Sequence, residues 1–302
     1  MRFLLFSLLI ACQLNAQEVF FEGNVYDHRT KEPIPYVNFS FLNTLKGTSS
    51  DQDGHFFMDL PTPYLKKQVH ISSLGFKDTI VDAEQVYNVK RFEMVEESFE
   101  LDEVVVTENF GSSDVLNPIS SYSLTSGFSS SSTPWVVALY FPNLGSQKKY
   151  IDKLTVFLKK SENFTRNSAK FRIRIYDVDE NTKKPGKDIL RKSIVLEHQI
   201  EQDFVSLDVA AFNIEMPRNG VYIGLEWLFV PYNWYKQTSR HPLTNKLIVE
   251  DRFAPTISGV YTQNQNYKVM IYGMGEWTDF KVKSRNNTEN FIPAVSLKLK
   301  RE

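Results

Sequence analysis

Polar and apolar residues alternate through the stretch Lys170-Phe171-Arg172-Ile173-Arg174-Ile175-Tyr176. Successive side chains of a β-strand point to opposite faces of its sheet, so this alternation predicts a strand with one face on a core and the other in water. Much of the chain has the same character: short runs rich in β-branched and aromatic residues lie between turn residues, without a convincing helical period. We therefore predict an all-β protein.

Length and composition limit the function classes. The 302 residues suit two domains of about 100–200 residues each. Hydrophobic residues make up 42% of the chain, enough for packed cores, and a net charge of −1 gives no reason to expect a nucleic-acid partner. Cys12 is the only cysteine, and no later segment has the apolar length of a membrane-spanning helix. These counts exclude a disulfide scaffold, a Cys-ligated metal site, a Cys nucleophile and a multi-span membrane protein.

The N-terminus has the pattern of an export signal. A positive charge precedes an apolar run over residues 3–11, which is well short of the roughly 20 residues of a membrane-spanning helix. Cleavage after Ala16 would remove a signal peptide of residues 1–16. Residues 9–12 alternatively resemble a bacterial lipobox, in which Cys12 would be lipidated and would anchor the protein. We expect an exported protein, located in the periplasm or at the outer membrane.

Strand patterns fill the first module, residues 17–108. They lie at residues 20–25, 36–41, 55–58, 69–72 and 90–94. Short strands at this spacing predict a β-sandwich. Gly54 follows Asp51 and Asp53 and supplies the positive φ that a tight hairpin requires. The two aspartates also resemble the start of a calcium loop, but Thr62 stands where the loop's glutamate belongs, so we predict a structural hairpin.

Several segments of this module resemble the carboxypeptidase regulatory-like domain, in the order of that family. They are GNVYD at 23–27, EPIPYVNF at 32–39, GTSSDQDGHF at 47–56, ISSLGF at 71–76 and LDEVVV at 101–106. The last is similar to the segment that closes the module in exported Bacteroidota proteins. The resemblance implies a seven-stranded, transthyretin-like sandwich without catalytic residues of its own. Such modules precede TonB-dependent transporter barrels or accompany other exported domains.

The second module begins after a serine-rich joint. Residues 109–133 contain ten serines and form either a flexible linker or an extended lead-in. About eight to ten strand patterns follow within residues 134–302, which predicts a second, jelly-roll-like β-sandwich. The segments RIYD at 174–177, PG at 185–186 and GLEW at 224–227 are similar to the partner domain of other small exported proteins with this front module. That resemblance implies no established activity.

Charge divides unevenly between the modules. Residues 17–108 hold 8 Lys and Arg against 17 Asp and Glu, whereas residues 109–302 hold 26 against 19. Either two solvated surfaces have opposite signs, or the basic module meets an anionic surface or docks against its acidic neighbour. Lys183, Lys184 and residues 187–192 form the densest basic patch, which we expect to be an exposed loop.

We predict no catalytic residue, no metal and no cofactor. His198 and Glu201 match the His-x-x-Glu pair of metallocarboxypeptidases, but the third ligand would have to be His241, and strand patterns do not fit the α/β fold of those enzymes. The sequence has no Gly-x-Ser-x-Gly elbow, P-loop or dinucleotide fingerprint. Asp78-Thr79-Ile80 resembles the acceptor of O-glycosylation in exported Bacteroidota proteins.

One aromatic cluster is a candidate binding site. Trp227, Tyr232, Trp234 and Tyr235 would form a platform for sugar rings, or they fill the core and cover its rim. We therefore predict a non-enzymatic cell-envelope protein, a scaffold or protein-interaction module, and as the alternative a carbohydrate- or envelope-glycan-binding protein. Its expected partners are envelope proteins or glycans, without nucleic acid, and with membrane contact only through an anchor at Cys12.

Overall fold

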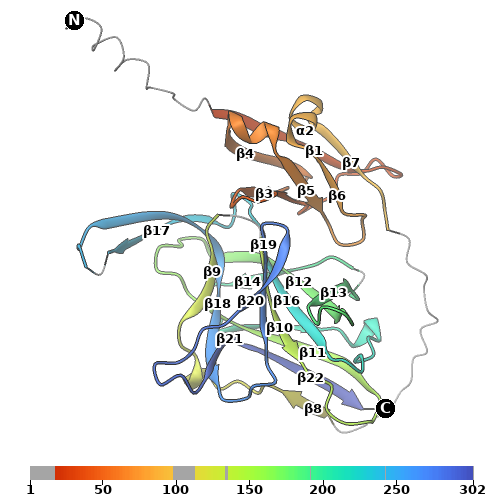
Figure 1. The fold of residues 1–302 in the computed structure, drawn as a ribbon, viewed down its shortest axis with the longest axis vertical. Helices are drawn as coiled ribbons and strands as arrows, with labels where there is room; N and C mark the ends of the chain where they lie inside the picture. The colour runs from red at the N-terminus through yellow and green to blue at the C-terminus, as the bar shows by residue number, and fades with distance from the viewer. Residues whose placement is uncertain (1–17, 98–112, 133–134, 191, 242, 302) are drawn as a thin grey trace, which may run out of the picture.

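The computed structural model describes residues 18–97, 113–132, 135–190, 192–241 and 243–301. The predicted signal peptide, Cys12 and the segment at 101–106 lie outside these residues. Strands dominate the described chain and confirm the all-β prediction. They form two stacked sandwiches, the first of which is red to orange in Figure 1 and lies at one end of the long axis. No helix in the described ranges is long and apolar enough to cross a membrane.

Within the described residues, the first sandwich has the seven strands that the resemblance implies. They are β1 (Glu18–Asp27), β2 (Asn38–Phe41), β3 (Gly47–Ser49), β4 (His55–Pro61), β5 (Gln68–Ser72), β6 (Thr79–Asp82) and β7 (Arg91–Met94). One sheet has the order β4-β1-β7 and the other the order β3-β2-β5-β6. A 3-10 turn, η1 (Thr62–Lys66), and a short helix, α2 (Ala83–Val89), complete the unit.

Aromatic side chains build the core of the first sandwich. Phe21 of β1, Phe39 and Phe41 of β2 and Phe56 of β4 are fully buried, with ring centroids 4.2 to 6.2 Å apart. Each contributes about 1.5–3 kcal/mol by leaving water, which is enough to hold two small sheets together. The sequence analysis missed α2, because a helix of seven residues is too short to display a period of 3.6.

Gly54 is required by the hairpin that leads into β4. Its φ is +76°, and a Cβ there would lie 2.8 Å from the carbonyl oxygen of Val25. We expect Gly54→Ala to lower the free energy of unfolding by about 1–3 kcal/mol, because alanine would be forced into a left-handed conformation. The control is Gly273→Ala, where a Cβ meets no atom within 4 Å. Equal urea midpoints for the two variants would contradict the prediction.

Glu93 ties β7 to the loop after β1. Hydrogen bonds from Lys31, His28 and Arg91 lower the pKa of Glu93 from 4.5 to about 2. The unfolded chain therefore binds this proton more readily, so the stabilisation is complete above pH 4.5 and is lost as the pH falls toward 2. We expect Glu93→Gln to flatten this part of the stability profile, measured by urea unfolding at a series of pH values. Identical acid limbs for both proteins would refute the assignment.

The second sandwich is larger than the sequence predicts. Among the described residues, one sheet has seven strands, with the path β13-β12-β16-β10-β19-β20 and β14 beside β12. The other has eight, with the path β17-β18-β11-β22-β8, β15 beside β11, and β9 and β21 beside β18. The expected eight to ten strands fall short because several strands have only four residues, too few for alternation to identify.

The bounds of these elements follow the chain from the joint to the C-terminus. They are β8 (Ser113–Leu116), η2 (Ser121–Ser123), β9 (Gly127–Ser130), β10 (Val136–Phe141), β11 (Lys149–Lys159), β12 (Ser168–Val178), β13 (Pro185–Asp188), β14 (Ile194–Gln199), β15 (Phe204–Asp208), η3 (Ala210–Phe212), β16 (Val221–Trp227), β17 (Trp234–Arg240), β18 (Leu247–Thr262), β19 (Val269–Gly273), β20 (Glu276–Phe280), β21 (Asn290–Pro293) and β22 (Val295–Arg301).

The described part of the serine-rich joint is built into the second sandwich. Strand β8 pairs with β22, and β9 pairs with β18. Leu116 and Phe128 enter the core, while the Asn117 amide donates to the carbonyl oxygen of Val295 at 2.8 Å. Residues 113–130 are therefore an integral part of the fold. In β8 and β9 the side chains alternate between the two faces of the sheet, so the apolar Leu116 and Phe128 face the core between polar neighbours.

Candidate functional site

The polar face of β12 is buried, which corrects the prediction that it meets water. Arg172 is fully buried, and the side chain of Arg174 is only 15% exposed. The neighbouring strand β16 is buried at all seven of its positions. The core of the second sandwich covers one face of these strands, and contacts with the first sandwich cover the other. The alternation therefore marks two buried faces.

Glu226 of β16 joins the two sandwiches. Its side chain is 2% exposed, and it lies opposite Arg172 in the β12–β16 register. Arg172 Nη1 donates to Glu226 Oε1 at 3.3 Å, and Arg174 Nη1 donates to Oε2 at 3.2 Å. From the first sandwich, the Asn38 amide donates to Glu226, and the Tyr36 carbonyl accepts from Arg172 at 2.5 Å. The buried charges are thus paired and hydrogen-bonded, as burial requires.

Strand β3 docks on the chain that follows β16. Ser49 N donates to the Phe229 carbonyl at 3.2 Å, and Phe229 N donates to Ser49 Oγ at 3.0 Å. Ser49 Oγ donates in turn to Asn38 Oδ1 at 2.7 Å, which orients the Asn38 amide toward Glu226. The acidic first module and the basic second module are therefore in direct contact through a hydrogen-bonded interface.

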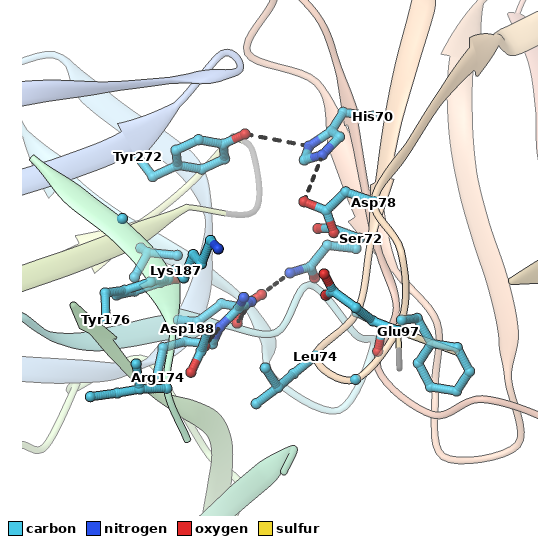
Figure 2. Close-up of a pocket in the computed structure, with 18 of the residues that line it drawn as sticks. His70, Ser72, Leu74, Asp78, Glu97, Arg174, Tyr176, Lys187, Asp188 and Tyr272 are labelled. Carbon is cyan, nitrogen blue, oxygen red and sulfur yellow. Dashed lines mark hydrogen bonds and ion pairs between the residues drawn. The ribbon is translucent and has the colours of Figure 1, made fainter. Parts of the chain in front are cut away.

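A cleft of about 850 Å³ lies between the sandwiches, next to this interface (Figure 2). On the first sandwich its lining includes outward-facing side chains of β2 and β5, where Asn38 lies opposite Ser72 and Ser40 lies opposite His70. The second sandwich contributes residues from six strands, chiefly Arg174, Tyr176, Asp188, Glu226, Tyr272 and Trp277. The period of two thus places polar side chains of both sheets on one shared cleft.

His70 connects the two walls. Its Nε2 lies 3.2 Å from Asp78 Oδ2, and its Nδ1 lies 3.4 Å from the Tyr272 hydroxyl. Figure 2 shows these contacts reaching from Tyr272 of the second sandwich to Asp78 of the first. The His70 side chain is only 13% exposed, whereas that of Asp78 is 59% exposed. Both nitrogens of the ring are engaged, so the imidazole is held in a fixed orientation at the cleft.

Burial raises the pKa values of three side chains that the second sandwich contributes to the cleft. Burial, with a smaller contribution from the negative charge of Asp78, raises the pKa of Tyr272 to about 12. Burial also raises the pKa of Tyr176 well above its ordinary value, against the opposing effect of Arg174. For Asp188, burial raises the pKa although Arg174 lies beside it. Both phenols are therefore neutral hydrogen-bonding groups at physiological pH.

The arrangement is suited to recognition. Arg174 Nε donates to Asp188 Oδ2 at 2.5 Å, and its Nη1 pairs with Glu226 at 3.2 Å, so the deepest charges of the cleft neutralise one another. In the part of the chain that the structure describes, no group of three or more His, Cys, Asp or Glu side chains is placed to hold a metal. Hydroxyl groups, aromatic rings and partly exposed charges remain to meet a ligand by hydrogen bonding and stacking.

Two of the four aromatic residues predicted to form a sugar-binding platform lie in the core. Trp227 is fully buried, stacks on Trp135 with ring centroids 4.7 Å apart, and donates its indole N–H to the Pro255 carbonyl at 2.8 Å. Tyr235 is 7% exposed, and its hydroxyl donates to Ser161 Oγ at 3.1 Å. Neither ring is available to a ligand at the surface.

The other two aromatic residues are half-exposed near the start of β17. Tyr232 is 38% exposed, and Lys170 Nζ lies 5.4 Å from the centre of its ring. Trp234 is 39% exposed, and Lys236 Nζ lies 5.3 Å from its ring. A cation therefore already lies close to each ring. The four predicted residues do not assemble into one exposed platform.

The His-x-x-Glu spacing does not produce a ligand pair. His198 is fully buried in β14, where its Nε2 lies 2.6 Å from the Gln202 carbonyl and burial lowers its pKa. The side chain of Glu201 is 83% exposed and pairs with Lys160 at 2.7 Å. His241 lies in the hairpin between β17 and β18. The three side chains have unrelated environments.

The predicted basic loop is divided between two hollows. Lys183 and Lys184 line a second cavity of about 660 Å³ together with Lys268. Lys187 belongs to β13 and lines the interdomain cleft instead. Part of the expected loop is therefore a strand, because residues 185–188 pair with β12.

Sequence reasoning missed the residues that line the cleft. Strand alternation places His70 on the outer face of β5 and Tyr272 on the outer face of β19. No sequence pattern states that these faces meet, since the two residues are separated by most of the chain. Trp277 lies in a strand of five residues that the sequence analysis did not identify.

Comparison with known proteins agrees with the architecture of the first sandwich. The family model of the CarboxypepD_reg-like domain matches residues 21–106, less than a third of the chain. The search of curated proteins returned no match. The matched region includes most of β1 and all of β2 to β7, and thus the wall of the cleft that carries His70 and Asp78. The first sandwich of this chain therefore matches the CarboxypepD_reg-like domain, whose β-sandwich architecture it shares.

Proposed function

We propose that the chain is a non-enzymatic, exported protein of the cell envelope, a scaffold or interaction module that takes up its partner in the interdomain cleft. The observation that carries the proposal is the composition of the cleft, because both sandwiches line it and neither forms it alone. Buried contacts of Glu226 with both sandwiches hold its walls in place. A rigid, pre-formed site between two domains is a common place for ligand binding.

Export is supported by the short apolar run at residues 3–11 and by the CarboxypepD_reg-like domain behind it. Fractionation of cells that produce the full chain with a C-terminal tag tests this part. We expect the protein in the envelope fractions, with an intact mass that lacks residues 1–16 or carries a lipid on Cys12. A cytoplasmic protein with its original N-terminus would exclude an envelope role.

Hydrogen exchange tests the cleft itself. The full-length mature protein is incubated with detergent-solubilised envelope extract, and protection of its amides is compared with the protein alone. We expect slower exchange in residues 70–78 and 269–277, which border the cleft from opposite sides. Protection confined to other surfaces, or no protection, would remove the cleft from the proposal. Mass spectrometry of the extract should show no new cleavage products, since the proposed protein is not an enzyme.

A further inference from the structure

An aromatic wall lies on one side of the cleft. Tyr272 and Trp277 face each other across the β19–β20 pair, with ring centroids 5.2 Å apart. Trp277 also meets Tyr176 of β12 edge to face at 5.4 Å. Trp277 is only partly buried, so part of its ring borders the cleft. The face of an indole ring carries partial negative charge, and the polarised C–H groups of a sugar ring can pack on it.

The opposite wall offers hydrogen-bonding groups of both kinds. Ser40 and Ser72 present hydroxyls, and Asp78, which His70 holds in place, presents a carboxylate that is mostly exposed. Lys187 adds an ammonium group from the second sandwich. The hydroxyl groups of a sugar both donate and accept hydrogen bonds, so a mixed set of partners suits them, and bonds to the charged groups are the stronger ones.

Three of the strands that line the cleft do not favour an extended peptide. Among the described residues, β2 lies between β3 and β5, β16 lies between β12 and β10, and β19 lies between β10 and β20. Their backbone groups are already paired within the sheets, so they present no free edge for strand addition. Strands β13 and β20, which carry Lys187 and Trp277, are the edges of their sheet, so only a ligand that meets β2, β16 and β19 must be recognised through side chains.

We propose that the interdomain cleft is a carbohydrate-binding site, in which one sugar ring packs on Trp277 and its hydroxyl groups bond with Asp78 and the serines of the facing wall. The inference rests on the proposed function and specifies its ligand class. The cleft's volume of about 850 Å³ lies within the range of about 300–1,000 Å³ that small-molecule sites occupy. The site is distinct from the aromatic run at 227–235, whose rings are buried or lie near a cation.

The test uses the full-length mature protein on an array of oligosaccharides that includes peptidoglycan fragments, O-antigen chains and neutral glycans. The best-bound oligosaccharide is then titrated and followed by isothermal titration calorimetry. We expect Trp277→Ala to weaken binding about tenfold or more, because truncation removes a central aromatic contact. The matched control is Trp234→Ala, a half-exposed tryptophan outside the cleft, which should bind as the parent does. Asp78→Asn should also weaken binding, because it removes a charged hydrogen-bond acceptor for the sugar hydroxyls. This variant tests the wall that the first sandwich contributes.

The outcomes separate the two proposals. No binding to any oligosaccharide, together with cleft protection by envelope extract, would overturn the carbohydrate inference and leave the cleft as a site for another partner. Absence of both would remove the cleft from the proposed function as well. Carbohydrate binding that Trp234→Ala weakens and Trp277→Ala leaves intact would also overturn the inference, since the sugar would then lie elsewhere. Thermal melts of each variant distinguish lost contacts from lost folding.

Discussion

Replacing Glu226 with alanine should lower the free energy of unfolding by about 3–5 kcal/mol, because it leaves Arg172 and Arg174 buried with less negative charge around them. Arg172 is fully buried, and it would keep only Ser193 and the Tyr36 carbonyl as partners. Urea unfolding of the parent and the variant measures the difference. The same change removes the acceptor of Asn38, so small-angle scattering should also detect looser domains.

A matched control separates burial from charge. Asp251→Ala breaks an ion pair with Lys236 in which both side chains are more than half exposed, and it should cost less than about 1 kcal/mol. Replacing the facing pair together, as Arg172→Met with Glu226→Leu, should cost less than Glu226→Ala alone, because Arg174 keeps Asp188. Equal losses of unfolding free energy for Glu226→Ala and Asp251→Ala would show that the interface between the sandwiches is hydrated and that the assigned network around Glu226 is wrong.

Trp227→Ala should lower the free energy of unfolding by about 3–5 kcal/mol, because it empties the largest buried side-chain volume of the second sandwich. The change also removes the stacking partner of Trp135 and leaves the Pro255 carbonyl without its indole donor. Differential scanning calorimetry of the full chain measures the loss.

The control for this prediction lies seven residues along the chain. Trp234→Ala removes the same side chain at a half-exposed position, and its cost should stay within about 1 kcal/mol. The pair therefore tests the structure's division of the aromatic run into core and surface. A larger loss for Trp234→Ala than for Trp227→Ala would contradict it.

The sequence predicts the strands of this protein better than it predicts what covers them. Alternation at residues 170–176 identifies β12 and assigns its two faces correctly. Alternation cannot show whether the polar face meets water or the polar surface of another domain, because an arginine side chain can be hydrogen-bonded in either environment. Arg172 and Arg174 were therefore expected in solvent, although the first sandwich and the opposing carboxylates enclose them.

Composition has a similar limit for the candidate site. An aromatic run such as 227–235 attracts a binding hypothesis, yet the rings of Trp227 and Tyr235 are needed for packing. The residues that border the cleft are isolated in sequence, as His70 and Trp277 illustrate, and come together only because two sheets dock face to face. The docking depends on a few hydrogen bonds, such as that from Phe229 N to Ser49 Oγ, which leave no pattern along the chain.

The enclosed Arg172 and Arg174 also limit whether the first sandwich can be exchanged for a similar domain of another protein. A CarboxypepD_reg-like domain from another protein, grafted in place of β1 to β7, would supply its own residues at the positions of Tyr36 and Asn38. Unless they matched, Arg172 and Glu226 would lose partners in a place that water cannot reach. Chimaeras of this chain should therefore assemble only when both halves of the contact are transferred together.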